Sequence, residues 1–550
     1  MTRLYLPLSR RTFVKLGATT AAAAALGCEP GTSPTDSGVP GRDAPAPPPA
    51  GRPPLGPARM ETVENLIIGS GFGGSITAHR LALAGHASVV LERGRRWTVT
   101  TPGDDVFSDM GIGEADNRSS FLAPQQPLPG IPRHRDFDLY TGVLERIFGD
   151  GIDIVCPAAV GGGSIVYSGM MVQPPRALFT EVFPAGISYD EMDTVWYPMV
   201  RSVIVPAASS LPDDILALPQ WTATRTFIEQ AEIAGYDVQR ILCGFDWEMA
   251  RAEARGDIPP QLIRGSYIFG LNSGAKATLD RSYLGIAESS GMAEVRPLHW
   301  VQRVGRNTDG TYRVEVDRID ENGVIQEAIV FSATRLFLCA GTANSTGLLL
   351  RAAAEGTITG LPSTLGEGFG NNGQHILARG GVGVNTGERQ AGPACAMIFD
   401  EPNRIAMENG RAPIGGEILI STGQGIPSGR GRLVWDAATG KVSTMWTPDL
   451  DQEAHDAALG IIDRLNAMNT GTRTTLPGLD VSITFHPLGG CVMGQTTDLF
   501  GRVVGVPGLY VIDGALLPGC TPLSNPFWTV SANSERCIAT ILAEDFGGAP

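Results

Sequence analysis

The sequence predicts an α/β protein, α+β overall, with a parallel sheet in one domain and a mixed or antiparallel sheet in another. A strand–turn–helix–strand unit with the spacing GxGxxG opens the globular part. Alternating stretches such as TYRVEVDRI and RLVWDAATGKVSTMW fit β-hairpins, the second with a turn at Ala438 to Gly440. A chain of 550 residues, 43% of them hydrophobic and 70 of them glycine, is long enough for two domains with many tight turns.

The first 28 residues are typical of an export signal. The stretch SRRTFVKLG places Arg10 and Arg11 before a short apolar run, which is the twin-arginine pattern. That run is far shorter than the ~20 residues of a membrane helix. The letters ALGC end at Cys28 and also fit a degenerate lipobox, so ordinary cleavage and lipidation at Cys28 both stay open. We expect an exported protein, secreted or periplasmic, which a modified Cys28 would anchor.

Residues 29–60 are rich in proline, glycine, alanine and serine and almost lack large apolar side chains. Such a composition cannot form a core and predicts an extended linker. The net charge of −15 without any Lys/Arg-rich run argues against nucleic acid as a partner. The eight cysteines form no CxxC and no cluster with histidine, so no metal site is expected; disulfides stay open in an exported chain.

The stretch VENLIIGSGFGGSITAHRLALAGHASVVLERG predicts one βαβ unit that binds the ADP half of a dinucleotide. After a strand at 66–68, Gly69 makes the tight turn and Gly71 admits the pyrophosphate at the helix N-terminus. Gly74 lets the helix approach the strand. The second strand ends on Glu92, which we expect to accept hydrogen bonds from the adenosine ribose.

The motif alone leaves FAD and NAD open. Export in the folded state favours a tightly held cofactor that is loaded before export, which is FAD. A second glycine cluster, VGGGSIVYSGMMV at residues 160–172, would let the backbone lie flat against a large planar ligand. We therefore predict FAD as the cofactor.

Several long motifs follow in order from about residue 63 to about residue 542. They are GSGFGG, TGVLERI, VGGGSIVYSGM, LFLCAGTANSTGLLLRA, LGEGFGNNG, HPLGGCVMG, GRVVGVPGLYVIDGALLPG and NPFWTVSANSERCIATIL. Over this length the chain resembles the cholesterol oxidases within the glucose–methanol–choline (GMC) oxidoreductases. The resemblance implies FAD-dependent oxidation of a 3β-hydroxysteroid to the 3-ketone, with O2 reduced to H2O2 and with a Δ5 to Δ4 isomerisation.

The resemblance also implies catalytic residues. His486 and Asn525 would flank the substrate oxygen, and an imidazole suits the acceptance of a hydroxyl proton. A histidine of the core is the alternative for His486. Pro487 and Pro526 restrict the preceding residues to extended backbone, which directs both side chains. The isomerising carboxylate would be Glu408 or, as a competitor, Glu417.

The expected cofactor contacts come from both glycine clusters and from the C-terminal part. They are Gly69, Gly71, Phe72, Gly73, Gly74, Glu92, Gly162, Gly163, Ser164, Val301, Asp513, Gly514, Asn525, Pro526 and Phe527. A turn cap is the alternative for Asp513. The FAD domain would combine residues 61–100, 275–365 and 500–545, and the substrate domain residues 101–274 and 366–499.

One departure from the family pattern concerns Tyr167 and Ser168, where members commonly have asparagine and glycine. This puts the substrate and the reaction with oxygen in question. Two other functions therefore stay open: an alcohol dehydrogenase of the same family that passes electrons to a quinone or a protein, and a non-catalytic lipid-binding protein. The expected partner is a small-molecule sterol or another alcohol, with a transient membrane-surface contact to reach it.

Overall fold

The computed structural model describes the chain from residue 57 to residue 547, apart from residues 112, 129–135, 206–208, 388, 413–414 and 476–481. The expected signal with Cys28, and the linker up to residue 56, lie outside the described residues. None of the described helices is long and apolar enough to cross a membrane. The first strand begins at Arg59, within the last two residues of the expected linker.

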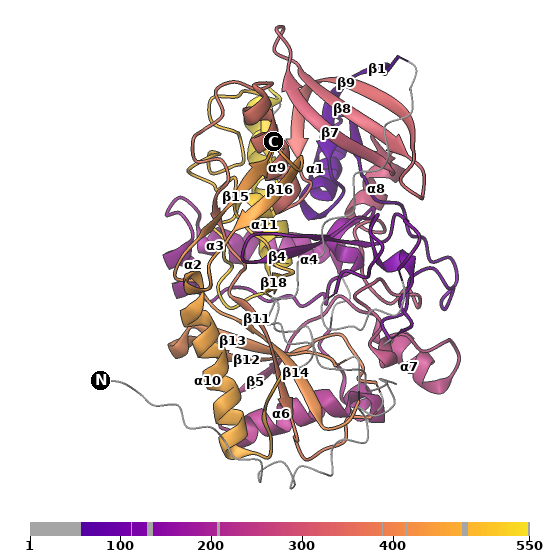
Figure 1. The fold of residues 1–550 in the computed structure, drawn as a ribbon, viewed down its shortest axis with the longest axis vertical. Coiled ribbons are helices and arrows are strands. Elements are labelled where there is room, and N and C mark those ends of the chain that lie inside the picture. The colour runs from indigo at the N-terminus through magenta and orange to yellow at the C-terminus, as the bar shows by residue number, and fades with distance from the viewer. Residues whose placement is uncertain are drawn as a thin grey trace, which may run out of the picture. The chain divides into compact units, whose positions relative to one another are not determined.

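A seven-stranded sheet carries the glycine motif, and the predicted α/β class is confirmed (Figure 1). The order is β6-β2-β1-β9-β8-β7, and β19 also pairs with β9. Strands β6, β2, β1, β9 and β19 are parallel, whereas β7 and β8 extend the sheet in antiparallel fashion. The strands are β1 (Arg59–Ile68), β2 (Ser88–Leu91), β6 (Ala293–Arg296), β7 (His299–Arg306), β8 (Tyr312–Ile319), β9 (Ile325–Leu338) and β19 (Leu509–Val511).

The stretch TYRVEVDRI forms β8 of this sheet, as a hairpin strand between β7 and β9. Helix α1 (Phe72–Leu83) packs against α8 (Tyr283–Ser289) and α11 (Pro526–Asp545). Because parallel strands end at the same edge, the turns that follow β1, β2, β9 and β19 lie together, as at ligand sites of open α/β sheets.

The second large sheet is six-stranded and antiparallel, with the order β17-β11-β14-β13-β12-β5. Its helix-covered face packs Ile398, Ile405 and Met407 beneath α6 (Thr222–Ile233) and α10 (Gln452–Met468), which run along the sheet (Figure 1). Since side chains alternate along a strand, Ala406 and Glu408 point to the other face. The strands are β5 (Val238–Arg240), β11 (Gln374–Gly380), β12 (Ala396–Asp400), β13 (Ile405–Asn409), β14 (Ile418–Gln424) and β17 (Thr472–Thr474).

The stretch RLVWDAATGKVSTMW forms the predicted hairpin, with Asp436 O accepting from Gly440 N in the turn. It belongs to a small sheet of its own: β10 (Glu367–Phe369), β15 (Gly431–Asp436) and β16 (Lys441–Met445). A further small sheet has β18 (Ile483–Thr484), β4 (Asp153–Pro157) and β3 (Leu144–Ile147). The other helices are α2 (Arg176–Val182), α3 (Tyr189–Glu191), α4 (Tyr197–Ile204), α5 (Asp213–Leu216), α7 (Trp247–Arg255) and α9 (Thr342–Glu355).

Candidate active site

The glycines of the first turn are needed for different structural reasons. Gly69 has a φ of +97°, and a Cβ there would lie 2.4 Å from Cys339 O. Cβ atoms on Gly73 and Gly74 would lie 1.6 Å from Ile512 O and 1.9 Å from Gly69 O, so packing alone requires both glycines. Gly71 differs, because a Cβ there meets nothing closer than an atom at 4.0 Å. The space beside Gly71, at the N-terminus of α1, therefore fits the approach of a phosphate group.

A prediction follows from this difference. Gly71→Val introduces a side chain only into the open space, so we expect a folded protein that binds no FAD. Gly74→Val should instead destabilise the fold, because its Cβ would overlap a backbone carbonyl. Visible absorbance reports flavin content, and far-UV circular dichroism with the melting temperature Tm reports folding. Normal flavin content in Gly71→Val would contradict the assignment of this turn to the cofactor.

Glu92 lies directly after β2 and is buried against the same turn. Its Oε2 accepts hydrogen bonds from Ser70 N at 3.1 Å and Ser70 Oγ at 2.7 Å, and its Oε1 accepts from Gly94 N at 2.9 Å. Burial raises the pKa of Glu92. A carboxylate has about four acceptor positions, so three bonds leave room for one ribose hydroxyl.

The second glycine cluster packs directly on the first. A Cβ on Gly162 would lie 2.5 Å from Gly71 Cα, and one on Gly163 would lie 3.0 Å from the Phe72 ring. Ser164 Oγ donates to Gly161 O at 2.7 Å and accepts from Leu279 N at 2.9 Å, which holds the turn closed. The structure therefore brings both glycine clusters together.

Three aromatic rings gather beside these turns. The Phe527 ring lies 5.4 Å from that of Phe72 and 4.9 Å from that of Tyr167, between ring centroids. Tyr167 donates its phenol hydrogen to Ala277 O at 2.7 Å. Tyr167 is thus held between the glycine clusters and the start of α11. Val301 lies elsewhere in the sheet, in β7, where it is buried and pairs with Val316.

Asp513 follows β19 and is buried. It accepts hydrogen bonds from Gly341 N at 2.9 Å, Ser345 Oγ at 2.5 Å and Ala515 N at 2.8 Å, and burial raises its pKa. These contacts are those of a turn cap, the alternative that the sequence left open. Gly514 O accepts from Gly489 N at 3.0 Å, which joins this turn to the segment that carries His486.

His486 is partly buried and its ring makes no hydrogen bond within the described part of the chain. Its Nδ1 is buried without a hydrogen-bond partner. Burial lowers the pKa of His486 to about 3, so the ring is neutral at pH 7. A neutral imidazole has one unprotonated ring nitrogen, which can accept a hydrogen bond and then a proton from a hydroxyl group.

Asn525 and Glu408 lie in contact. Asn525 is the N-cap residue of α11, with extended backbone before Pro526, and its Nδ2 donates to Glu408 Oε2 at 3.2 Å. Its Oδ1 is buried without a partner. Burial raises the pKa of Glu408 to about 7. Glu417 is exposed and accepts from Gly383 N at 3.4 Å, just before the start of β14, so the structure places Glu408 rather than Glu417 beside Asn525.

The segment Gly370–Gln374, which begins in the motif LGEGFGNNG and ends one residue after it, holds the loop that carries His486. Gly370 and Leu488 exchange two backbone hydrogen bonds at 2.9 and 3.0 Å. Gln374 Oε1 accepts from Phe485 N at 2.8 Å.

The same segment holds the loop that carries Asn525. Asn372 Nδ2 donates to Ser524 O at 2.8 Å, and its Oδ1 accepts from Thr521 N at 2.7 Å. Sequence reasoning named this motif without giving Asn372 or Gln374 a role. The signal was an asparagine pair before a glycine, which suits the left-handed φ of +61° at Asn372.

A groove of about 540 Å³ lies beside α11, on the side of Trp528. Its volume falls within the ~300–1,000 Å³ of small-molecule sites. Its lining combines apolar and aromatic side chains with polar ones, among them Met171, Tyr189, Tyr197, Phe399, Trp528, Arg201, Gln239 and Glu401.

The sequence is similar to those of known oxidoreductases. Residues 445–534, which include His486 and Asn525, match the family model described as GMC oxidoreductase. The chain is 27% identical over 553 residues to a cholesterol oxidase of Mycobacterium tuberculosis, covering 86% of this chain and 90% of the relative. It is 23% identical over 562 residues to a cholesterol oxidase of Acinetobacter baumannii, covering 87% and 94%.

Solved structures share the fold. Pyridoxine 4-oxidase from Mesorbium loti superposes with a TM-score of 0.60 at 17% identity, covering 87% of this chain and 99% of that one. A fungal aryl-alcohol oxidase gives 0.58 at 13% identity, covering 88% and 99%. The family match over residues 445–534, the similarity over most of the chain and the shared fold confirm the expected resemblance to the GMC oxidoreductases.

Proposed function

We propose that this protein is an exported, FAD-dependent oxidase that converts a 3β-hydroxysteroid to the 3-ketone and reduces O2 to H2O2. The proposal rests on two side chains, His486 and Asn525, which both lie in the segment that matches the family model. His486 has a neutral ring whose Nδ1 is buried without a hydrogen-bond partner, and Asn525 stands at the start of α11 in contact with a buried carboxyl group. The similarity to cholesterol oxidases supports a sterol as the substrate.

The residues that would hold FAD fit the group. The open space at Gly71 and the N-terminus of α1 suit the pyrophosphate, and Glu92 keeps one acceptor position for the ribose. When bound, FAD would supply the acceptor for the hydride and transfer two electrons to O2. The protein's own task is then to orient the hydroxyl group and accept its proton.

His486 would accept that proton. A pKa of about 3 makes the imidazole a weak base towards an alcohol, but it keeps the ring neutral and able to accept a hydrogen bond. Loss of hydride turns the alcohol oxygen into that of a protonated ketone, which is a far stronger acid. A weak base is therefore sufficient at the moment of transfer, and Asn525 would fix the oxygen from a second direction.

Glu408 would carry out the isomerisation. A carboxyl group with a pKa of about 7 can both accept and return a proton near neutral pH. It would take a proton from C4 of the Δ5-ketone and return it at C6, which moves the double bond into conjugation. Its contact with Asn525 supports this role next to the proposed oxidation site.

The proposal is tested by the spectrum of the purified protein. We expect a yellow protein whose flavin absorbance is bleached by cholesterol without oxygen and returns with equimolar H2O2 on exposure to air. A colourless protein, or a flavin that no 3β-hydroxysteroid reduces, would refute it. Bleaching that a quinone or a protein reverses, but O2 does not, would support the alternative family member that uses another electron acceptor.

Replacing Asn372 tests whether its hydrogen bonds hold the loop before Asn525 in position. Asn372→Gly keeps the left-handed backbone but removes the bonds to Ser524 and Thr521. We expect kcat for sterol oxidation to fall about tenfold at unchanged flavin content, because the loop before Asn525 loses its fixed position. Asn403→Gly, at an exposed turn, is the matched control and should keep the parent kcat. A parent-like kcat in Asn372→Gly would show that these bonds do not matter to the site.

The export route is proposed from the sequence alone. Replacing Arg10 and Arg11 together with lysine should leave active, flavin-containing precursor in the cytoplasm, since the twin-arginine machinery reads the pair. Cell fractionation measures the outcome. Unchanged export would argue for another route.

A further inference from the structure

Arg411 is a buried cation that the reaction described above does not use. It follows β13 at a distance of three residues from Glu408, and 8% of its surface is exposed. Its Nε, Nη1 and Nη2 are all buried, and none of them has a hydrogen-bond partner. In the described part of the chain Arg411 also forms no ion pair.

The other buried arginines show what the fold normally provides. Arg379 donates to Gln230 Oε1 and Asn466 Oδ1, both at 2.7 Å. Arg536 donates to Asn533 Oδ1 and to Leu499 O. A guanidinium group has five N–H donors, and each one that is buried without an acceptor costs free energy. Arg411 is therefore an exception among the buried arginines, because its guanidinium group lacks the hydrogen-bond acceptor that a buried donor needs.

The position of the Arg411 side chain is imposed by its surroundings. Gly265 has a φ of +68°, and a Cβ there would lie 2.5 Å from Arg411 Cδ, so the chain makes room for the arginine stem at this point. The backbone after Arg411 is held by Gln390, whose Oε1 accepts from Ala412 N at 2.8 Å. The guanidinium group is thus held in place by packing rather than by an acid.

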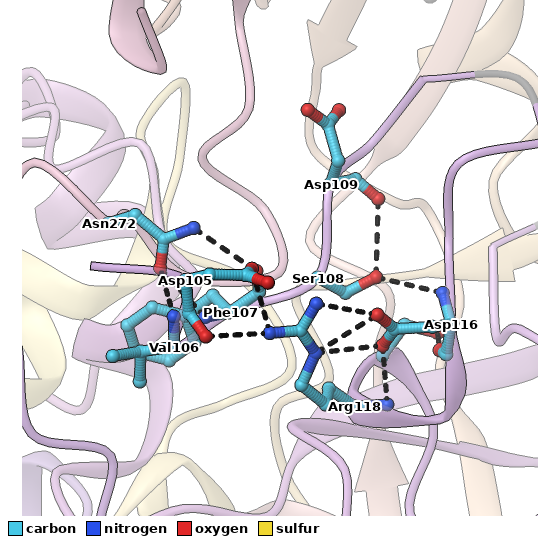
Figure 2. Close-up of polar contacts among 9 residues, drawn as sticks. Asp105, Val106, Phe107, Ser108, Asp109, Asp116, Arg118 and Asn272 are labelled. Atoms are coloured by element: carbon cyan, nitrogen blue, oxygen red, sulfur yellow. Dashed lines mark hydrogen bonds and ion pairs between the residues drawn. The ribbon is translucent and has the colours of Figure 1, made fainter. Parts of the chain in front are cut away.

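The nearest acidic loop does not neutralise Arg411. In this loop (residues 105–118) Arg118 donates hydrogen bonds to the Asp116 carboxylate, and Phe107 N donates to Asn272 Oδ1. The carboxylate of Asp109 points away from these contacts (Figure 2). That carboxylate accepts from Arg389 Nη2 and from Ser266 Oγ. Arg389 holds the pKa of Asp109 well below its usual range, against the opposing effect of burial. The carboxylate of Asp109 is therefore already paired with Arg389.

Arg411 borders the wall that faces the reaction site. Tyr267 packs in one apolar cluster with Met397, Ala406 and Leu523. Ala406 lies on the Glu408 face of the six-stranded sheet, and Leu523 precedes Asn525 by two residues. The pKa of Tyr267 is raised by burial, and the charges of both Arg411 and Glu408 act on it. Three residues span at most about 10 Å, so Arg411 and Glu408 can contact one ligand of sterol size.

We propose that Arg411 is an anion-binding residue that recognises a carboxylate on the substrate. The preferred substrate is then a hydroxysteroid that also carries an acid group, rather than neutral cholesterol. This inference rests on the proposed function for the hydroxyl end of the molecule and names the chemistry of its other end. A carboxylate would accept two parallel N–H bonds from the guanidinium group and compensate its charge.

Arg411 keeps its charge at the pH of the test. Burial lowers its pKa to about 10, with Tyr267 and Asp109 acting in the opposite direction and Arg389 in the same one, so the group is still protonated at pH 7. The substrate carboxylate, with a pKa near that of aspartate, is ionised there as well.

The test compares three probes on the flavin-loaded protein: a 3β-hydroxysteroid with a side-chain carboxylate, its methyl ester, and cholesterol. We expect the acid to have a KM about 10- to 100-fold below that of its ester, as for one charge-assisted bidentate contact. Arg411→Met, which keeps most of the volume, should raise the KM of the acid by this factor and leave the ester unchanged. Arg379→Met is the matched control, because it removes a buried arginine on the helix-covered face and should keep the preference for the acid.

A second measurement separates this proposal from the proposed function. The corresponding 3-keto acid and its ester bind without turnover, and binding raises Tm. A larger Tm shift with the acid, lost in Arg411→Met, supports the anion site even if no sterol reduces the flavin. Equal KM values and equal Tm shifts for acid and ester in the unaltered protein would overturn the proposal, whether or not any variant folds.

Discussion

His486→Ala should oxidise cholesterol about 10²–10⁴-fold more slowly than the parent protein, the usual scale for a positioned acid–base group. The variant should keep its flavin, because the glycine turns do not depend on the imidazole. It should also still isomerise added Δ5-3-ketone, since that reaction needs only Glu408. Stopped-flow bleaching of the flavin measures the oxidation, and absorbance of the conjugated ketone measures the isomerisation.

His455→Ala is the matched control, because His455 lies on α10 with 38% of its side chain exposed. We expect it to oxidise cholesterol at the parent rate. Oxidation at the parent rate in His486→Ala would mean that the ring is structural, as the alternative of a core histidine requires.

The pH dependence of stability should report on the same ring. The folded pKa of His486 is about 3 and the ordinary value is 6.5, so between these values the unfolded chain binds a proton that the folded protein excludes. The free energy of unfolding should therefore fall as pH drops from 6.5 towards 3. His486→Ala should show a smaller fall in this window, measured by denaturant titration at each pH.

Glu408→Gln should separate the two reactions in the opposite sense. The amide can still accept from Asn525 Nδ2, so we expect cholesterol to bleach the flavin at near the parent rate. The product should be the unshifted Δ5-ketone, because an amide cannot carry the proton from C4 to C6. Chromatography of the ketones after a single turnover measures this, and a 10²–10⁴-fold loss of isomerisation is expected.

Glu417→Gln, which changes an exposed carboxylate before β14, should still yield the conjugated ketone. If Glu408→Gln yields it as well, the isomerase role of Glu408 is wrong. In the parent, isomerisation should increase as pH rises through about 7, since the carboxylate is the base that removes the C4 proton.

For Glu408, the free energy of unfolding should depend on pH in the opposite direction from that expected for His486. The folded protein holds the Glu408 proton up to a pH of about 7, whereas the unfolded chain loses it near 4.5. The contribution of the buried carboxyl group is therefore present below 4.5 and is lost as pH rises to about 7. Glu408→Gln has no such group, so its Tm relative to the parent should increase across this window.

Local patterns predicted the elements that depend on short-range chemistry. The βαβ unit around Gly69 to Glu92, the strand TYRVEVDRI and the hairpin with its turn at Gly440 all form as expected. In each case the determining contacts lie within a few residues or within one strand pair. The strand of TYRVEVDRI could be predicted, but not its place beside β9 in the seven-stranded sheet, because pairing depends on distant partners.

The candidate site was predictable in part. The motifs named His486 and Asn525, and the resemblance left Glu408 and Glu417 as alternatives. Only the folded chain shows that Asn525 contacts Glu408, 117 residues away, and that Glu417 is exposed before the start of β14. The role of Asp513 as the cap of its turn could not be separated from cofactor contact, because both use the same carboxylate.

By itself the sequence determined the resemblance to the GMC oxidoreductases, the glycine-rich turns and the candidate side chains His486 and Asn525, since all of these are written in contiguous residues. Only the tertiary structure decided which glycines leave space for a ligand, how Gly370–Gln374 holds the loops of His486 and Asn525 together, and that Arg411 is buried without an acid. The physical reason is that burial, the pKa shifts that follow from it and the pairing of charges depend on segments hundreds of residues apart, and these meet only when the core forms.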